Sequence, residues 1–134
     1  MNYKELLNNV LLKEVLENPN SLINIDINDI KDLFLQSEEI HFFDVRVNAR
    51  EEYRMEQLVE QIKEKGKSIS SYTRALIYFF FPKRNPLLME ELQPFSEWID
   101  SISGEFMIKW GMATQSTQEL RAIVLLQSDQ RAVL

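Results

Sequence analysis

The spacing of apolar residues along the chain predicts helices and strands in alternation. In residues 2–17 the apolar side chains recur every three or four positions, which is the stripe of an amphipathic helix. A short extended piece follows, and then a short helix capped at Asn28 or Asp29. Residues 40–47 and 74–81 are predicted strands, and the second is apolar on both faces, as in the middle of a sheet.

The second half of the chain continues this alternation. Helices are predicted at residues 48–65 and 86–102, and Pro94 should kink or restart the second of them. Strands are predicted at residues 105–113 and 119–127, separated by a short polar turn. We therefore expect these last two strands to pair with each other as a hairpin.

This order predicts an α+β fold. We expect a two-layer sandwich in which a four-stranded mixed sheet (β-α-β-α-β-β) carries its helices on one face, with an additional N-terminal helix. The chain is long enough for one domain spanning residues 1–134. Within it we expect an N-terminal helical segment at 1–38, the α+β core at 39–127 and a tail at 128–134.

Composition excludes several kinds of functional site. The 134 residues include no cysteine, one histidine (His41) and three well-separated glycines, which leaves no thiolate or multi-histidine metal site and no Gly-rich phosphate loop. A net charge of −6 without a dense basic run argues against nucleic-acid binding. We therefore expect neither a metal nor another cofactor. Four acidic residues give helix 48–65 a face typical of a solvated surface: Glu51, Glu52, Glu56 and Glu60.

No segment suggests a membrane or a targeting signal. The longest apolar run has eight residues, far fewer than the roughly 20 that a membrane-spanning helix needs. The N-terminus lacks the continuous apolar core of a signal peptide. We therefore expect a cytoplasmic protein without a membrane partner.

Three stretches, in a shared order, carry a family resemblance. The first has the pattern N-x-D-x-x-D at Asn24, Asp26 and Asp29 before a helix. The second reads I-x-W-G-x-A at 108–113, and the third, at 119–126, begins E-x-R. Together they resemble the C-terminal domain of FtsZ, the tubulin-like cell-division GTPase, over roughly residues 5–127. The resemblance implies that domain's fold and a role in assembly.

The departures from the family are equally informative. The Gly-rich nucleotide-binding half of FtsZ has no counterpart in this sequence, so we expect a stand-alone relative of the C-terminal domain without GTPase activity of its own. In the family, the loop corresponding to Asn24, Asp26 and Asp29 enters the nucleotide pocket of the next subunit, where its carboxylates help to position water. The residues alone allow a second interpretation, in which Asp26, Asn28 and Asp29 cap a helix.

The apolar stripe of residues 2–17 is wider than a lone helix on a small sheet requires. Two arrangements are open: a second copy or a partner covers the stripe, or the helix lies over the open face of its own sheet. Two placements are also open for the side chain of Trp110, which can lie in the core or at an interface. The candidate interface residues are Tyr3, Leu7, Val10, Leu11 and Trp110.

Two function hypotheses follow. The first is a non-enzymatic interaction or assembly module linked to cell division or to a tubulin-like filament, which contacts a protein partner, an FtsZ- or tubulin-like GTPase, or a second copy. The alternative is a small-molecule-binding or catalytic oligomer whose site forms between subunits. A deep pocket with converging charges would favour the alternative, and a flat apolar or acidic surface would favour the first hypothesis.

Overall fold

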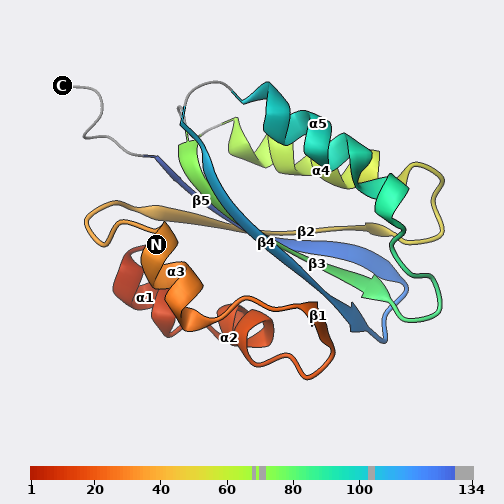
Figure 1. Ribbon diagram of the computed structural model, residues 1–134, viewed down its shortest axis with the longest axis horizontal. Helices are drawn as coiled ribbons and strands as arrows, with labels where there is room; N and C mark the ends of the chain where they lie inside the picture. Colours follow the sequence, from red (N-terminus) through yellow and green to blue (C-terminus); the bar gives the residue numbers. More distant parts are fainter. Residues whose placement is uncertain (68, 70–71, 103–104, 129–134) are drawn as a thin grey trace.

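The computed structural model, which describes residues 1–67, 69, 72–102 and 105–128, contains a five-stranded mixed sheet between two layers of helices (Figure 1). The strand order is β1-β4-β3-β5-β2. The strands are β1 (Ser21–Ile23), β2 (Ile40–Asn48), β3 (Tyr72–Pro82), β4 (Met107–Gln115) and β5 (Glu119–Ser128). The helices are α1 (Tyr3–Leu7), α2 (Val10–Leu16), α3 (Ile27–Leu33), α4 (Arg54–Gly66), the 3₁₀ turn η1 (Met89–Leu92) and α5 (Gln93–Ser101).

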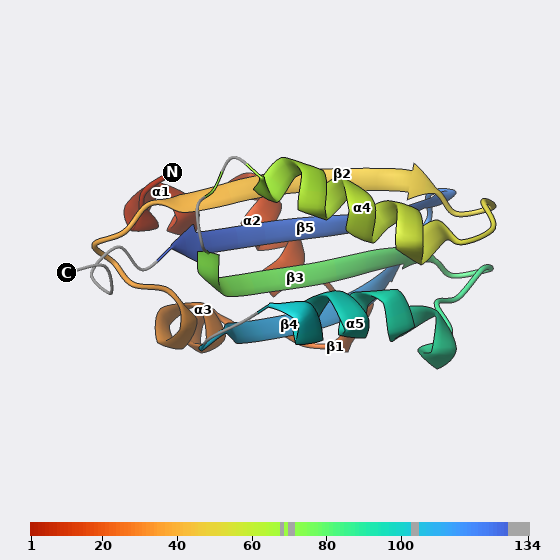
Figure 2. The ribbon, with the colours of Figure 1, turned by 90° about the horizontal axis from the view of Figure 1, so that it is seen from above.

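The central strand β3 is buried on both faces. Because successive side chains of a strand point to opposite faces, the apolar residues of β3 belong to two separate cores. Ile77 and Phe79 belong to the core under α4 and α5, which lie side by side on one face (Figure 2). Leu76 and Phe80 belong to the core under α1, α2 and α3 on the other face. The sheet is therefore the middle of three layers.

Most of the predicted elements are confirmed. The α+β class and the mixed sheet are correct, and each of the four predicted strands matches an observed one to within two residues at either end. The sheet has a fifth strand because β1, within the predicted extended piece, pairs antiparallel with β4. The two-layer description holds for the α4–α5 side, and α1–α3 add a further layer on the second face. The predicted tail begins within β5, which ends at Ser128, and residues 129–134 lie outside the described part.

The predicted hairpin is wrong. β3 lies between β4 and β5, pairing parallel with β4 and antiparallel with β5. The residues between β4 and β5, 116–118, cross the end of β3, a gap of about 10 Å that three extended residues can span. Placing the most apolar strand in the middle provides both of its edges with hydrogen-bonding partners and both of its faces with cover.

The predicted helix 2–17 is two helices. Asn9 caps α2, since its side-chain oxygen accepts hydrogen bonds from the backbone N–H groups of Leu11 (2.8 Å) and Leu12 (3.3 Å). Asparagine competes with helical backbone hydrogen bonding and is favoured at caps, so Asn8–Asn9 breaks the helix. The break lets α1 contribute Leu6 and α2 contribute Leu12 to one core. Farther along the chain, Pro94 lies in the first turn of α5, which confirms that it restarts the helix.

We predict that Gly111→Ala destabilises the sheet edge. A Cβ atom at Gly111 would lie 2.5 Å from the backbone oxygen of Ile23 on β1 and 2.7 Å from the ring of Tyr78. Either β1 or Tyr78 must therefore move, and overpacking of this kind typically lowers the free energy of unfolding by about 1–3 kcal/mol. Urea denaturation measures the change.

Gly66→Ala is the matched control. The nearest atom to a Cβ at position 66 would be a ring carbon of Tyr72 at 3.4 Å, an ordinary contact distance. Since alanine is also a better helix former than glycine, this variant should be neutral or stabilising. Equal stability of the two variants would contradict the close approach at Gly111.

Candidate functional site

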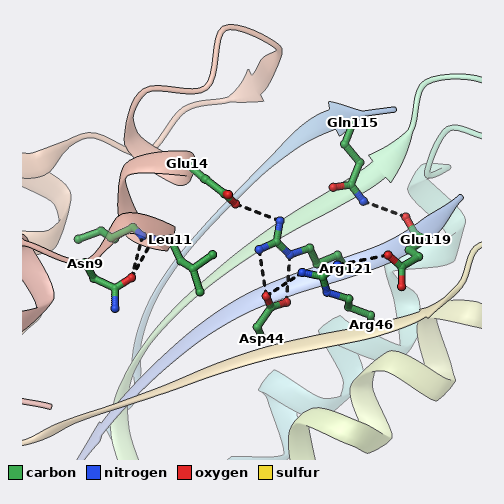
Figure 3. A network of polar contacts seen from close by, with 9 residues as sticks. Asn9, Leu11, Glu14, Asp44, Arg46, Gln115, Glu119 and Arg121 are labelled. Carbon is green, nitrogen blue, oxygen red and sulfur yellow. Dashed lines mark hydrogen bonds and ion pairs between the residues drawn. The ribbon is translucent and has the colours of Figure 1, made fainter. Parts of the chain in front are cut away.

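A network of charged side chains connects α2 to the sheet (Figure 3). At its centre is Arg121 on β5, whose residue surface is only 7% exposed. Its Nε and Nη2 atoms each donate a 3.0 Å hydrogen bond to the carboxylate of Asp44 on β2. Its Nη1 atom donates to Glu14 on α2 at 3.1 Å. The guanidinium group lies 5.0 Å from the ring centroid of Phe80.

The network continues along the β2–β5 pair. Arg46 donates to Asp44 at 3.1 Å and to Glu119 at 3.3 Å (Figure 3). Burial raises the pKa of Asp44, but the hydrogen bonds from Arg121 and then Arg46 outweigh it, so the pKa of Asp44 lies below its usual range. Because every carboxylate of the network is paired with an arginine, the network is suited to fixing α2 on the sheet rather than to acid–base chemistry.

Arg121 is the arginine of the E-x-R pattern at 119–126, and the pattern alone predicts no role for it. Two signals point to it in hindsight: it is the one charged residue in the apolar run 120–126, and Asp44 is the acidic residue of the apolar strand at 40–47. A cation in a buried strand requires a counter-charge, and the β2–β5 pairing brings these two together. The network borders a groove of about 630 Å³ between α2 and the β4–β5 connection.

The family-like loop forms a helix cap. The side chain of Asp26 accepts a 3.0 Å hydrogen bond from the backbone N–H of Asp29, and the side chain of Asp29 accepts one of 2.9 Å from the backbone N–H of Asp26. Lys109 also donates to Asp29 at 2.9 Å. The pKa of Asp29 is lowered, first by the backbone hydrogen bond from Asp26 and then by Lys109.

Thus the structure brings two of the three predicted loop residues together. The cap employs the carboxylates of both Asp26 and Asp29, while Asn24 is exposed on the approach to the helix. Helix capping explains these residue types at this spacing without any ligand. A role of the loop toward a nucleotide held by another chain remains a prediction.

The stripe of residues 2–17 lies over the chain's own sheet, the second of the two arrangements considered. Tyr3, Leu7 and Leu11 are half-buried against the core beneath α1 and α2, whereas Val10 is 73% exposed. Trp110 is half-buried, with its ring edge-on to those of Phe79 and Phe95. Of the predicted interface candidates, Val10 is therefore the one with most of its side chain free.

Other exposed apolar side chains are distributed along the β4 edge of the sheet, on β1, at the start of α3 and at the start of β4. Of the eight large apolar residues exposed in the described ranges, four lie here. Ile23 is paired with Met112 of β4, and the Lys109–Asp29 ion pair fixes the start of α3 beside the same strand. The β4-edge surface, as we name it, consists of Leu22, Ile23, Ile27 and Met107.

The described part of the chain shows neither a metal site nor a membrane span. Over residues 1–67, 69, 72–102 and 105–128, no three or more histidine, aspartate or glutamate side chains are grouped so as to hold a metal ion. None of the helices in these ranges is both long and apolar enough to cross a membrane. His41 is half-buried near the start of β2.

We predict that Asp44 makes the fold sensitive to acid. Because the folded protein lowers the pKa of Asp44, its stabilising effect is complete above the ordinary value of 3.8 and is lost as the pH falls through the lower, folded value. Asp44→Asn should reduce the free energy of unfolding by about 2 kcal/mol at pH 7, since it leaves Arg121 without its bidentate partner. The difference in free energy of unfolding between wild type and variant should be smaller at pH 3 than at pH 7, as urea denaturation at both pH values would show.

Asp100→Asn, which removes an exposed carboxylate on α5, is the control and should leave stability nearly unchanged at either pH. A pH-independent gap for Asp44→Asn, or no gap at all, would count against the proposed role of the network.

Comparisons with known proteins identify the fold. No protein-family model and no curated protein matches the sequence. Among solved structures, the chain is similar to an FtsZ variant from M. jannaschii, with 20% identity and a TM-score of 0.67 over 98% of this chain and 42% of that one. A second M. jannaschii FtsZ structure, of an empty dimer, has 20% identity and a TM-score of 0.64 over 98% and 41%. The predicted resemblance to FtsZ is thus confirmed, and nearly the whole chain has the fold of a region that makes up less than half of FtsZ.

Proposed function

We propose that this chain is a non-enzymatic interaction module that assembles, through its β4-edge surface, with a tubulin-like filament protein or with a second copy of itself. One observation carries the proposal: half of the large apolar side chains exposed in the described ranges lie along one sheet edge. Exposed apolar side chains concentrated on one side of a soluble protein are typical of an interaction surface.

The geometry of this edge supports the proposal. β1 is three residues long and pairs with the C-terminal part of β4, at Met112 and Ala113. Short edge strands are common where a sheet must avoid uncontrolled pairing, while side chains beside them remain available for a specific partner. Leu22 and Ile27 flank Asn24, in the loop for which the sequence resemblance to FtsZ implies a contact with the next subunit. One of the two similar FtsZ structures is itself of a dimer.

The alternative of a catalytic oligomer lacks a specific supporting observation. The groove beside α2 contains Arg121 and Glu14, but these two groups are paired with each other. Asp29 is likewise paired, with Lys109. As part of the same proposal we place the protein in the cytoplasm, acting in cell division or another process that uses a tubulin-like filament.

The double variant Leu22→Lys/Ile27→Lys tests the surface. Sedimentation velocity, on the protein alone up to ~200 μM and mixed with purified FtsZ, should show association for the wild type; a Kd of that order corresponds to about −5 kcal/mol. The double variant should bind at least about tenfold more weakly, because two apolar contacts become charges. Its circular dichroism should be unchanged, since both side chains are exposed.

Val10→Lys is a control for the site of substitution, because it adds a single lysine at an exposed apolar position on α2, away from the β4 edge. The proposal would be overturned if the wild type stayed monomeric and did not bind FtsZ, or if Val10→Lys weakened association as much as the double variant does.

We also expect the purified chain to release no phosphate from GTP above the no-protein background. The reason is that the sequence holds three scattered glycines and hence no Gly-rich loop to cradle phosphates. A phosphate-release assay with a GTP-hydrolysing FtsZ as positive control measures this. Turnover that co-purifies with the chain and scales with its concentration would refute the non-enzymatic assignment.

A further inference from the structure

A second group of exposed apolar side chains lies on the opposite side of the sheet from α1–α3, where the first turns of α4 and α5 meet. A groove of about 480 Å³ runs between them, with Met55 buried along it and Pro94 half-buried on the α5 side. Tyr53, 64% exposed, forms part of its lining. Leu88 and Met89, also exposed, lie in the segment that leads into the groove through η1.

The walls of this α4–α5 groove are held in place by a buried arginine. Arg54 donates to the carboxylate of Glu91 through Nε at 2.7 Å and through Nη2 at 2.9 Å. It also donates to the backbone oxygens of Ala49, Asn85 and Pro86. These bonds fix the segment before η1 against the start of α4, so the groove exists before any partner binds. Preformed surfaces lose less conformational entropy on binding.

The charge of the groove defines its partner. Glu52, Glu56, Glu90 and Glu97 line it, and none of the four takes part in an ion pair within the described part of the chain. Glu52 precedes α4 and Glu56 lies in its first turn, so both bring negative charge to the start of that helix. The one cation in the lining, Arg54, is already paired with Glu91. A complementary partner therefore brings positive charge together with an apolar side chain.

We propose that the α4–α5 groove binds a short basic segment of a partner protein, with Lys or Arg side chains against Glu52, Glu56 and Glu97 and an apolar side chain against Tyr53. This second surface is separate from the β4 edge and does not depend on the function proposed above. A second copy of the chain is a poorer occupant, since each copy carries a net charge of −6. A metal ion is not supported either, because the described carboxylates do not converge on a common point.

Peptide binding tests the groove directly. The probe is a fluorescein-labelled octapeptide of alternating lysine and leucine, followed by fluorescence anisotropy. Glu56→Gln/Glu97→Gln should weaken binding by about fivefold or more. Glu17→Gln/Asp32→Asn, which removes the same net charge from the other side of the sheet, should bind within about twofold of the wild type. Equal weakening in the two variants would overturn the proposal.

Tyr53→Asn separates binding from folding. Tyr53 is the only non-glycine residue with a positive φ in the described part of the chain (φ 60°), a conformation that asparagine tolerates better than tyrosine. The variant should therefore be at least as stable as the wild type and still lose about fivefold or more in affinity for the probe. Unchanged affinity would show that the apolar contact is absent.

Backbone amide NMR shifts locate the bound probe. They should change around Glu52–Glu56 and Glu90–Glu97 and stay fixed on α1–α3. Changes spread over the whole surface, or equally tight binding of an all-lysine octapeptide, would show nonspecific attraction only and would refute the site. If Tyr53→Asn abolished self-association, the occupant would be a second copy and the proposal would fail. Leu22→Lys/Ile27→Lys should bind the probe like the wild type, so the outcome is independent of the β4 edge.

Discussion

The structure depends on one constraint: β3 carries apolar side chains on both faces, and both must be kept from water. Residues 75–81 are almost completely buried, split between two cores. Covering one face requires α4 and α5, and covering the other requires the N-terminal helices. Placing β4 on one edge and β5 on the other completes the enclosure. The same constraint explains why the two last strands are separated by β3 instead of forming a hairpin.

The face of the sheet opposite α4 and α5 is covered by short helices, which are stabilised by their contacts with the sheet. Helices of five and seven residues, as in α1 and α2, are marginal in isolation, so their apolar contacts and the Arg121 network must hold them. Glu14 on α2 accepts a hydrogen bond from Arg121, which also donates to Asp44 on β2. The apolar stripe that could have served a partner is consequently used within the chain. The two binding surfaces that we propose lie elsewhere, on the β4 edge and in the α4–α5 groove.

Hydropathy patterns predicted the elements better than their arrangement. The alternation at 40–47 and the apolar run at 74–81 depend on local residues, and both strands were predicted correctly. The strand order depends on which edges meet in space, which no local pattern encodes. The break at Asn8–Asn9 was missed because apolar spacing continues through it, although asparagine pairs favour caps. The left-handed backbone at Tyr53, which helps to shape the α4–α5 groove, has no sequence signal, since tyrosine rarely adopts it.

Each chain covers both faces of its own sheet with its own helices. An isotope-filtered NOE experiment on an equimolar mixture of ¹³C-labelled and unlabelled protein tests it most directly. In the fully labelled protein, the methyl groups of Leu12 and Val15 should show NOEs to those of Ile123 and Leu125, which share their core. In the filtered mixture these NOEs should vanish, because they arise within one chain. Intermolecular NOEs between the same methyl groups would show instead that the helices of one chain cover the sheet of another.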